Sequence, residues 1–249
     1  MQIVDCEQGS ELWHATRLGV PTGSTIKKLA SKTKLGELKN RQKYAINLRG
    51  KALGISSDYE SPAMAAGSLG EANALARLSF ETGIDFERVG FIWGDDTRTW
   101  GVSPDAVLFN GDAIDDGAEI KRLGYANHSF CEWTGQIPAE HFPQVAMNLY
   151  CCKAKQWHFR CQMSDTEPQQ VRDAASEVTV VLSRGDARYI RWVEIFERGI
   201  ADFVAMLDKM RAAYGLCPIS DREIDQALPR KVIAFADTYE SMVSDGIVM

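Results

Sequence analysis

The residue pattern changes character near residue 84, and this change constrains the fold more than any other feature of the sequence. The residues before it carry helix signals: Ser10 suits a helix N-cap, Pro21 would break the first helix, and Gly54 and Gly83 end the two long helical stretches. We therefore predict that the first eighty residues are helical, with helices over 10–17, around 26–29, over 38–53 and over 62–82.

The residues after this point favour short strands, because they are rich in β-branched and aromatic side chains and are interrupted by turn signals. The pair Asn110-Gly111 favours a tight hairpin. We predict consecutive strands of an antiparallel meander over 86–93, 99–102, 106–109 and 118–121.

The rest of the chain mixes both patterns. We predict a helix over 138–150, a strand over 156–163, a last strand over 189–193 and helices over 193–214 and 232–242, whereas 167–183 has both helical and β-branched character. These elements indicate an α+β (layered α/β) fold with a central mixed β-sheet flanked by helices. We expect one domain over 1–215, helical in 1–83 and containing the sheet in 84–215, and a C-terminal helical extension over 216–249.

The composition, 45% hydrophobic and 25% charged residues, is that of an ordinary soluble globular protein. Asp5 and Glu7 stand where a signal peptide needs an apolar stretch, and no run approaches the roughly 18 apolar residues of a membrane span. The six cysteines include no CxxC pair, which argues against a zinc site. We expect a cytoplasmic protein with reduced thiols and no membrane partner.

The charge of the chain is unevenly distributed. The net charge is −6, yet the segment from Trp13 to Leu53 carries ten basic residues against one acidic residue, Glu37. One basic face on an otherwise acidic body is compatible with a nucleic-acid partner, although a solvated helix face would show the same pattern.

The sharpest motif is Ser103-Pro104-Asp105, followed fourteen residues after the aspartate by Glu119-Ile120-Lys121. Alternate side chains of a strand share a face, so Glu119 and Lys121 point one way and Ile120 the other. The hairpin at Asn110-Gly111 would bring Asp105 beside them. Two carboxylates and an ammonium are then expected to converge on one point.

These residue types suit phosphodiester hydrolysis. Mg²⁺ prefers oxygen ligands, which Asp105, Glu119 and the carbonyl of Ile120 could supply. Such an ion acidifies a bound water and neutralises charge in the transition state, and a second ion beside the leaving oxygen would complete a two-metal scheme, with Mn²⁺ as a possible substitute. Lys121 would orient or help to deprotonate the attacking water. By themselves, however, a Pro-Asp pair and a Glu-x-Lys triplet also arise by chance.

Two further features bear on this site. Gly67 and Gly70 lie inside the predicted helix over 62–82, where each costs about 1 kcal/mol relative to alanine, so a close neighbour is expected there, with Glu71 facing the metal. That neighbour could be another helix or the strands of the site. The helix predicted over 138–150 carries a polar stripe, separate from its apolar stripe, that consists of His141, Gln144 and Asn148. This polar stripe could be solvated, or it could place Gln144 in the cleft.

Taken in order, these motifs resemble the lambda-type phage exonucleases, or YqaJ-like viral recombinase nucleases, of the PD-(D/E)xK superfamily. The resemblance covers about residues 8–163. Its six elements are Trp13-x-x-x-Arg17, Thr22-Gly23-Ser24, Gly67-x-x-Gly70-Glu71, Ser103-Pro104-Asp105, Glu119-Ile120-Lys121 and Gln144.

The resemblance implies a restriction-endonuclease-like core and a Mg²⁺-dependent exonuclease encoded by a phage or prophage. Such an enzyme degrades one strand of double-stranded DNA from a 5′ end to mononucleotides, leaving 3′ overhangs for recombination by strand annealing. It also implies that Arg17, Ser24 and Ser103, beside Trp13, hold the terminal 5′-phosphate. A guanidinium with hydroxyls at a helix N-terminus suits a phosphate.

One departure from the family concerns this phosphate site. Family members often have another arginine shortly after the Glu-x-Lys motif, where this chain has Asn127 and His128. Arg122 is near in sequence, but as the strand neighbour of Lys121 it should point to the opposite face. A strict preference for a 5′-phosphate is therefore not implied. The resemblance also implies a ring-shaped homotrimer and a single-strand annealing protein as partner.

Three other interpretations stay open. An endonuclease or a helicase-associated nuclease module would share the same core but would not need a DNA end. A non-catalytic DNA-binding protein would use the basic segment alone. In the third, the likeness concerns the fold only, and Asp105 and Glu119 are ordinary surface carboxylates.

Overall fold

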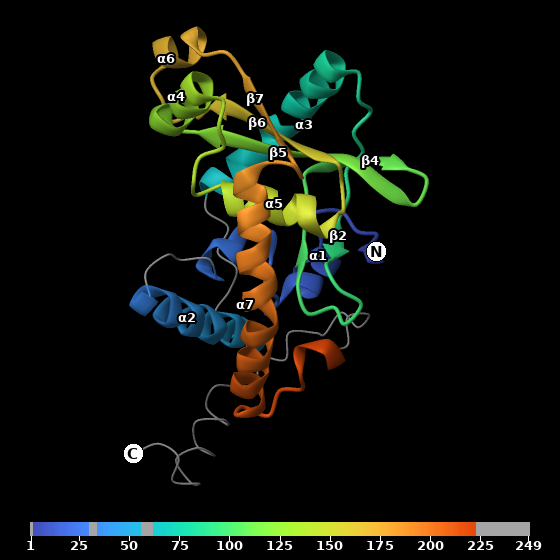
Figure 1. Cartoon of the computed structure of the whole chain (residues 1–249). Coiled ribbons are helices and arrows are strands. Elements are labelled where there is room, and N and C mark those ends of the chain that lie inside the picture. The colour runs from blue at the N-terminus through green and yellow to red at the C-terminus, as the bar shows by residue number, and fades with distance from the viewer. Residues whose placement is uncertain (1, 30–33, 56–61, 223–249) are drawn as a thin grey trace.

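The computed structural model describes residues 2–29, 34–55 and 62–222, and its strands form two sheets (Figure 1). In the larger sheet, β5 and β6 run parallel and the outer pairs antiparallel; its order is β4 (Ala106–Asn110), β5 (Ala113–Leu123), β6 (Gln156–Met163) and β7 (Val178–Ser183). The smaller sheet is antiparallel, with the order β1 (Gln2–Val4), β2 (Phe91–Trp93) and β3 (Gly101–Val102).

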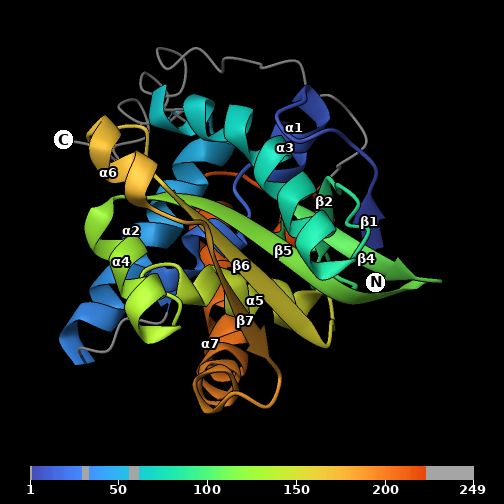
Figure 2. The ribbon, with the colours of Figure 1, turned by 90° about the horizontal axis from the view of Figure 1, so that it is seen from above.

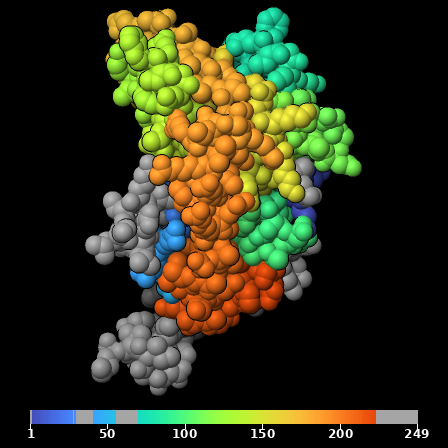
Figure 3. All heavy atoms as spheres, in the orientation of Figure 1, coloured from blue at the N-terminus to red at the C-terminus, as the bar shows by residue number. Residues whose placement is uncertain are grey.

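Helices cover both faces of the larger sheet (Figure 2). On one face lies α3 (Pro62–Thr82); on the other lie α4 (Tyr125–Thr134) and α5 (Phe142–Cys151). The long helix α7 (Ala187–Ala212) packs beyond α5 and forms a ridge on the face shown in Figure 3. The remaining helices are α1 (Glu11–Arg17), α2 (Lys34–Ala52), α6 (Gln169–Ala174) and the 3-10 helices η1 (Gly23–Leu29) and η2 (Ile219–Asp221). The predicted mixed sheet flanked by helices is therefore confirmed.

The predicted four-strand meander is wrong. Its last two segments form the β4–β5 hairpin around Gly111, whose φ of 61° suits glycine. Its first two segments are shorter, β2 and β3, and lie in the separate sheet, where β2 pairs with the N-terminal strand β1 on one side and with β3 on the other. β3 and β4 belong to different sheets, and Pro104 between them has no N–H to donate to a ladder. The presence of β1 also shows that the first eighty residues are not wholly helical.

The predicted strand over 189–193 is wrong as well, because those residues belong to α7. Asp186 caps this helix by accepting from the backbone N–H groups of Arg188 at 2.7 Å and Tyr189 at 3.3 Å. A buried stripe at helical spacing then outweighs the local β preference of its aromatic residues; it includes Tyr189, Trp192, Phe196, Gly199, Phe203 and Leu207.

Three other stretches were predicted ambiguously, were not predicted, or lie partly outside the described residues. The ambiguous residues 167–183 form α6 and β7, and α4 was not predicted. Of the predicted C-terminal extension, the structure describes residues up to 222, so the helix predicted over 232–242 lies outside the described residues. Ile219 in η2 is 1% exposed and packs into the main core.

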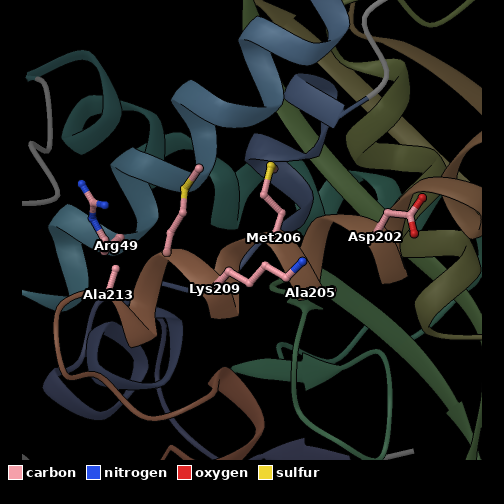
Figure 4. Close-up of a pocket in the computed structure, with 7 residues that line it drawn as sticks. Arg49, Asp202, Ala205, Met206, Lys209 and Ala213 are labelled. Carbon is pink, nitrogen blue, oxygen red and sulfur yellow. The ribbon is translucent and has the colours of Figure 1, made fainter.

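Helix α2 packs against α7 (Figure 1). Tyr44 of α2 stacks on Phe203 of α7, with ring centroids 5.2 Å apart. A shallow hollow between these two helices is lined by Arg49, Asp202, Ala205, Met206, Lys209, Met210 and Ala213 (Figure 4). All six cysteines carry free thiols, as predicted. Within the described residues, no helix combines the length and apolar character needed to cross a bilayer.

Candidate active site

The end of the β4–β5 ladder creates an open strand edge. The last pair is Ala106 with Ala118, and from Glu119 to Leu123 strand β5 pairs only with β6 among the described strands. Asp105 closes over this edge, because its Oδ2 accepts the N–H of Ile120 at 2.6 Å. The N–H and C=O groups of one strand residue point to the same side, so the Ile120 carbonyl also faces Asp105.

The three residues of the Glu-x-Lys motif divide between the faces of the sheet as predicted. Ile120 is buried against α3, in a cluster with Leu75 and Leu78. Glu119 and Lys121 lie on the α5 face, where Nζ of Lys121 contacts Oε1 of Glu119 and donates to the carbonyl of Ile120 at 3.2 Å. Asp105, Glu119 and Lys121 thus lie together at the open edge of β5.

Helix α5 supplies the hydrogen-bond donors that hold Glu119. Nε2 of Gln144 donates to Oε1 at 2.6 Å, and Nδ2 of Asn148 donates to Oε2 at 2.8 Å. Glu119 and Asn148 are each 1% exposed, so both carboxylate oxygens are satisfied inside the protein. The structure places Gln144 at the Glu-x-Lys motif, one of the two positions that the sequence left open for it. The role of Asn148 was missed, although its i,i+4 spacing from Gln144 in the polar stripe was a usable signal.

The side chain of Glu71 on α3 faces the same group of charges. Burial and the charge of Asp105 raise the pKa of Glu71, while the charge of Lys121 opposes this shift. Burial raises the pKa of Asp105, and burial together with Asp105 raises the pKa of Glu119 to about 7. The charge of Asp105 therefore makes ionisation of both Glu71 and Glu119 harder.

This arrangement suits a divalent cation. In the described part of the chain, no three His, Cys, Asp or Glu side chains converge as a metal-binding group. Asp105 and Glu119 provide two carboxylates, and the Ile120 carbonyl provides a third oxygen. The ammonium of Lys121 already lies against Glu119 and that carbonyl, which shows that these oxygens accept a positive charge. An all-oxygen set with unfavourable carboxylate ionisation fits Mg²⁺ or Mn²⁺.

The pKa of Glu119 predicts how metal binding depends on pH. Because this pKa is raised to about 7, Glu119 is largely protonated at lower pH, and a cation must displace the proton. We expect the affinity for Mg²⁺ to fall by up to about tenfold per pH unit below pH 7. In Asn148→Leu the carboxylate loses a donor, so this fall should begin about one pH unit higher.

Isothermal titration calorimetry across pH 5.5–9 measures both effects. Asn127→Leu is the matched control, because Asn127 on α4 donates to Glu140 at 2.5 Å and not to Glu119. An affinity for Mg²⁺ that is independent of pH, or an Asn148→Leu profile that overlays the wild type, contradicts this account of Glu119.

A second cluster lies beside Asp105, at the residues expected to hold a 5′-phosphate. Nε1 of Trp13 donates to Oγ of Ser103 at 3.0 Å, and the guanidinium carbon of Arg17 lies 3.7 Å from the centroid of the Trp13 ring. Ser10 caps α1 and thereby fixes Trp13 and Arg17, four residues apart. The structure therefore brings Trp13, Arg17 and Ser103 together.

Ser24 reaches the site through the start of η1. A Cβ placed on Gly23 would lie 3.1 Å from Oδ1 of Asn148 and 3.7 Å from Cγ of Gln144, so η1 packs closely on α5. Ser24 follows Gly23, is exposed, and lies with its Oγ 3.3 Å from the hydroxyl of Thr22. Ser24 thus lies next to the close contact between η1 and the two α5 residues that hold Glu119.

The residues that replace the family's extra arginine do not join this cluster. His128 is fully buried and contacts the carbonyl of Ser176 at 2.9 Å. Arg122 pairs with Asp165 and lies against α3, where a Cβ on Gly70 would come within 1.7 Å of Nη2. Arg122 of β5 is thus the close neighbour of Gly70, and its side chain points away from Lys121. The side chains around Gly67 lie outside the described residues.

The fold is shared with solved exonucleases. LHK-Exo, an alkaline exonuclease from Laribacter hongkongensis, is 24% identical with a TM-score of 0.63, and the match covers 83% of this chain and 98% of that chain. The structure of LHK-Exo in complex with dAMP gives 23% identity, a TM-score of 0.64 and the same coverage. A phage-related exonuclease from Haemophilus somnus 129PT is 10% identical, with a TM-score of 0.54 and coverage of 78% and 96%.

The architecture is thus that of the alkaline exonucleases. Residues 12–155 match the YqaJ-like viral recombinase domain, and the chain belongs to that family. The matched residues contain Trp13, Arg17, both carboxylates, Lys121 and the α5 amides. Comparison with curated proteins finds no sequence match.

Proposed function

We propose that this protein is a metal-dependent 5′ to 3′ exonuclease that degrades one strand of double-stranded DNA to mononucleotides and leaves 3′ single-stranded overhangs. The observation that carries the proposal is the convergence of Asp105, Glu119 and Lys121 on the open edge of β5, directly beside the Trp13–Arg17–Ser103 cluster. A hydrolytic centre and a phosphate-binding cluster so close together suit removal of the terminal nucleotide.

Each side chain has a definable task in this reaction. Asp105, Glu119 and the Ile120 carbonyl would hold Mg²⁺, which supplies positive charge at the scissile phosphate and acidifies water. Lys121, 27% exposed at its side chain, orients the attacking water and offsets the charge of the phosphate. Gln144 and Asn148 keep Glu119 in one orientation, as preorganisation of the site requires.

The cluster of Trp13, Arg17 and Ser103, with Ser24 nearby, would bind the DNA end. The guanidinium of Arg17 is fixed against Trp13, and the hydroxyls of Ser103 and Ser24 can donate to phosphate oxygens. A phosphate held here places the first phosphodiester at the carboxylates. dAMP, the ligand in the LHK-Exo complex, belongs to the product class expected of this reaction, the deoxynucleoside monophosphates.

A ring of three copies and a single-strand annealing partner belong to the same proposal. A ring would collect the basic residues of the segment from Trp13 to Leu53 around the duplex, despite the net charge of −6. Light scattering during gel filtration with duplex DNA tests the trimer, and a monomer under those conditions contradicts it.

The direct test compares linear, nicked circular and closed circular duplex DNA, with and without Mg²⁺. The linear substrate carries one 5′-phosphorylated, end-labelled strand. We expect mononucleotides from the 5′-ended strand of the linear DNA and no cutting of closed circles. Cutting of closed circles would identify an endonuclease, and binding without Mg²⁺-dependent cutting would identify a non-catalytic DNA-binding protein.

A further inference from the structure

The segment from Phe86 to Gly90 runs alongside β4 and leads to the candidate active site. Glu87 and Val107 exchange two backbone hydrogen bonds of 2.8 Å as an antiparallel bridge. An extension of this antiparallel register by one residue places Arg88 opposite Ala106, and an extension by two residues places Val89 opposite Asp105.

The side chain of Gln8 holds this segment in register. Its Nε2 donates to the carbonyl of Val89 at 2.9 Å and to the carbonyl of Pro104 at 2.8 Å. One amide therefore ties the residue after Arg88 to the residue before Asp105. The backbone of Arg88 is consequently fixed relative to the carboxylates, on both sides, by Glu87 and Gln8.

The face on which Arg88 lies follows from its neighbours. Residues directly opposite in paired strands share a face, and Ala106 is buried against α3. Phe86, two residues before Arg88, is buried in the same cluster. Arg88 itself is exposed, so its side chain extends along the α3 face toward solvent. Glu71 also approaches the site from α3.

The electrostatics of the site agree with this placement. The charge of Arg88 lowers the pKa of both Glu71 and Asp105, against the effect of burial on each. A guanidinium that acts on both carboxyls lies at the rim of the site, where an incoming phosphate would also come within its reach.

We propose that Arg88 contacts a backbone phosphate of the DNA strand being degraded, on the α3 side of the two carboxylates. This inference rests on the proposed function and adds a cation to Lys121 and Arg17. A guanidinium fits a phosphate with two parallel hydrogen bonds, and the fixed backbone of Arg88 reduces the cost of ordering it.

Salt dependence of DNA binding tests this contact. Fluorescence anisotropy with a 5′-phosphorylated duplex, in EDTA so that no cutting occurs, gives log Kd against log salt concentration. Each phosphate contact contributes about 0.9 to this slope. We expect Arg88→Ala to lower the slope by about one and Arg88→Lys to keep it. Arg191→Ala, which removes an exposed arginine of α7, should leave the slope unchanged.

The outcomes separate this contact from the proposed function. An Arg88→Ala slope equal to that of the wild type, in a wild type that cuts linear DNA, overturns the contact alone. A wild type that binds duplex DNA but never cuts it overturns the exonuclease, while the slopes still report on Arg88. An equal loss of slope in Arg191→Ala shows a general charge effect and also overturns the contact.

Discussion

Replacement of Lys121 by alanine should lower the rate of nucleotide release from linear duplex DNA by about 10³-fold or more, because positioned charge at a reacting phosphate contributes on this scale. Lys121 contacts Glu119 and the Ile120 carbonyl, and its charge acts on both Asp105 and Glu119. Its side chain is partly exposed, so the fold should survive the truncation. Single-turnover kinetics at saturating enzyme measures the chemical step free of binding.

The control for this change is Lys155→Ala. Lys155 pairs with Asp115 at 2.8 Å, and its side chain is 72% exposed, so the substitution removes the same charge away from the carboxylates. It should leave the rate within about twofold, since exposed ion pairs contribute little. If Lys121→Ala cuts DNA as fast as Lys155→Ala, Lys121 takes no part in the chemical step, and the carboxylates alone must account for the activity.

The central part of the site could be predicted from the sequence because its determinants are local. The hairpin is set by the Asn110-Gly111 turn, and the alternation of side chains along β5 assigns Glu119 and Lys121 to one face. The approach of Asp105 involves the partner strand, and there the register set by the turn is shifted by one residue through an irregularity between Leu108 and Phe109 that no sequence pattern marks. The seventeen residues from Asp105 to Lys121 therefore contain most of the geometry of the carboxylates.

What could not be predicted depends on contacts between distant residues. Strand β1 pairs with β2 across almost ninety residues, and a Cβ on Gly90 would lie 2.3 Å from the carbonyl of Cys6, so the N-terminal segment is pressed against it. No local pattern marks such a partner. Gln8 likewise acts on Val89 and Pro104, and its sequence context is that of an ordinary surface glutamine.

The residues that hold Glu119 could likewise not be predicted from the pattern of their own helix, because their role depends on contact with another element. The pattern of α5 separated a polar stripe from an apolar one, but a polar stripe on a helix is as compatible with solvent as with a cleft. Only the position of α5 over β5 turns Asn148 into a buried donor. Propensity failed in α7 for a related reason, since burial of its aromatic stripe decides its conformation.

Asp105 combines two roles that substitution can separate, and its replacement should have an effect as large as that of Lys121. Its Oδ2 caps the open edge of β5 through the N–H of Ile120, and its charge serves the proposed cation site. Asp105→Asn keeps an acceptor oxygen and removes the charge. We expect it to fold normally, to lose Mg²⁺ binding in calorimetry, and to cut at least about 10³-fold more slowly.

Asp105→Ala should lose the same activity and, in addition, about 1–2 kcal/mol of stability, because the N–H of Ile120 then lacks its partner. Chemical denaturation of the two variants therefore separates the structural role from the catalytic one. In Asp105→Asn, removal of the neighbouring charge should also lower the pKa of Glu119, since Asp105 is one cause of its elevation. If Asp105→Asn binds Mg²⁺ and cuts like the wild type, Asp105 is only an edge cap, and the candidate site lacks one of its two metal-binding carboxylates.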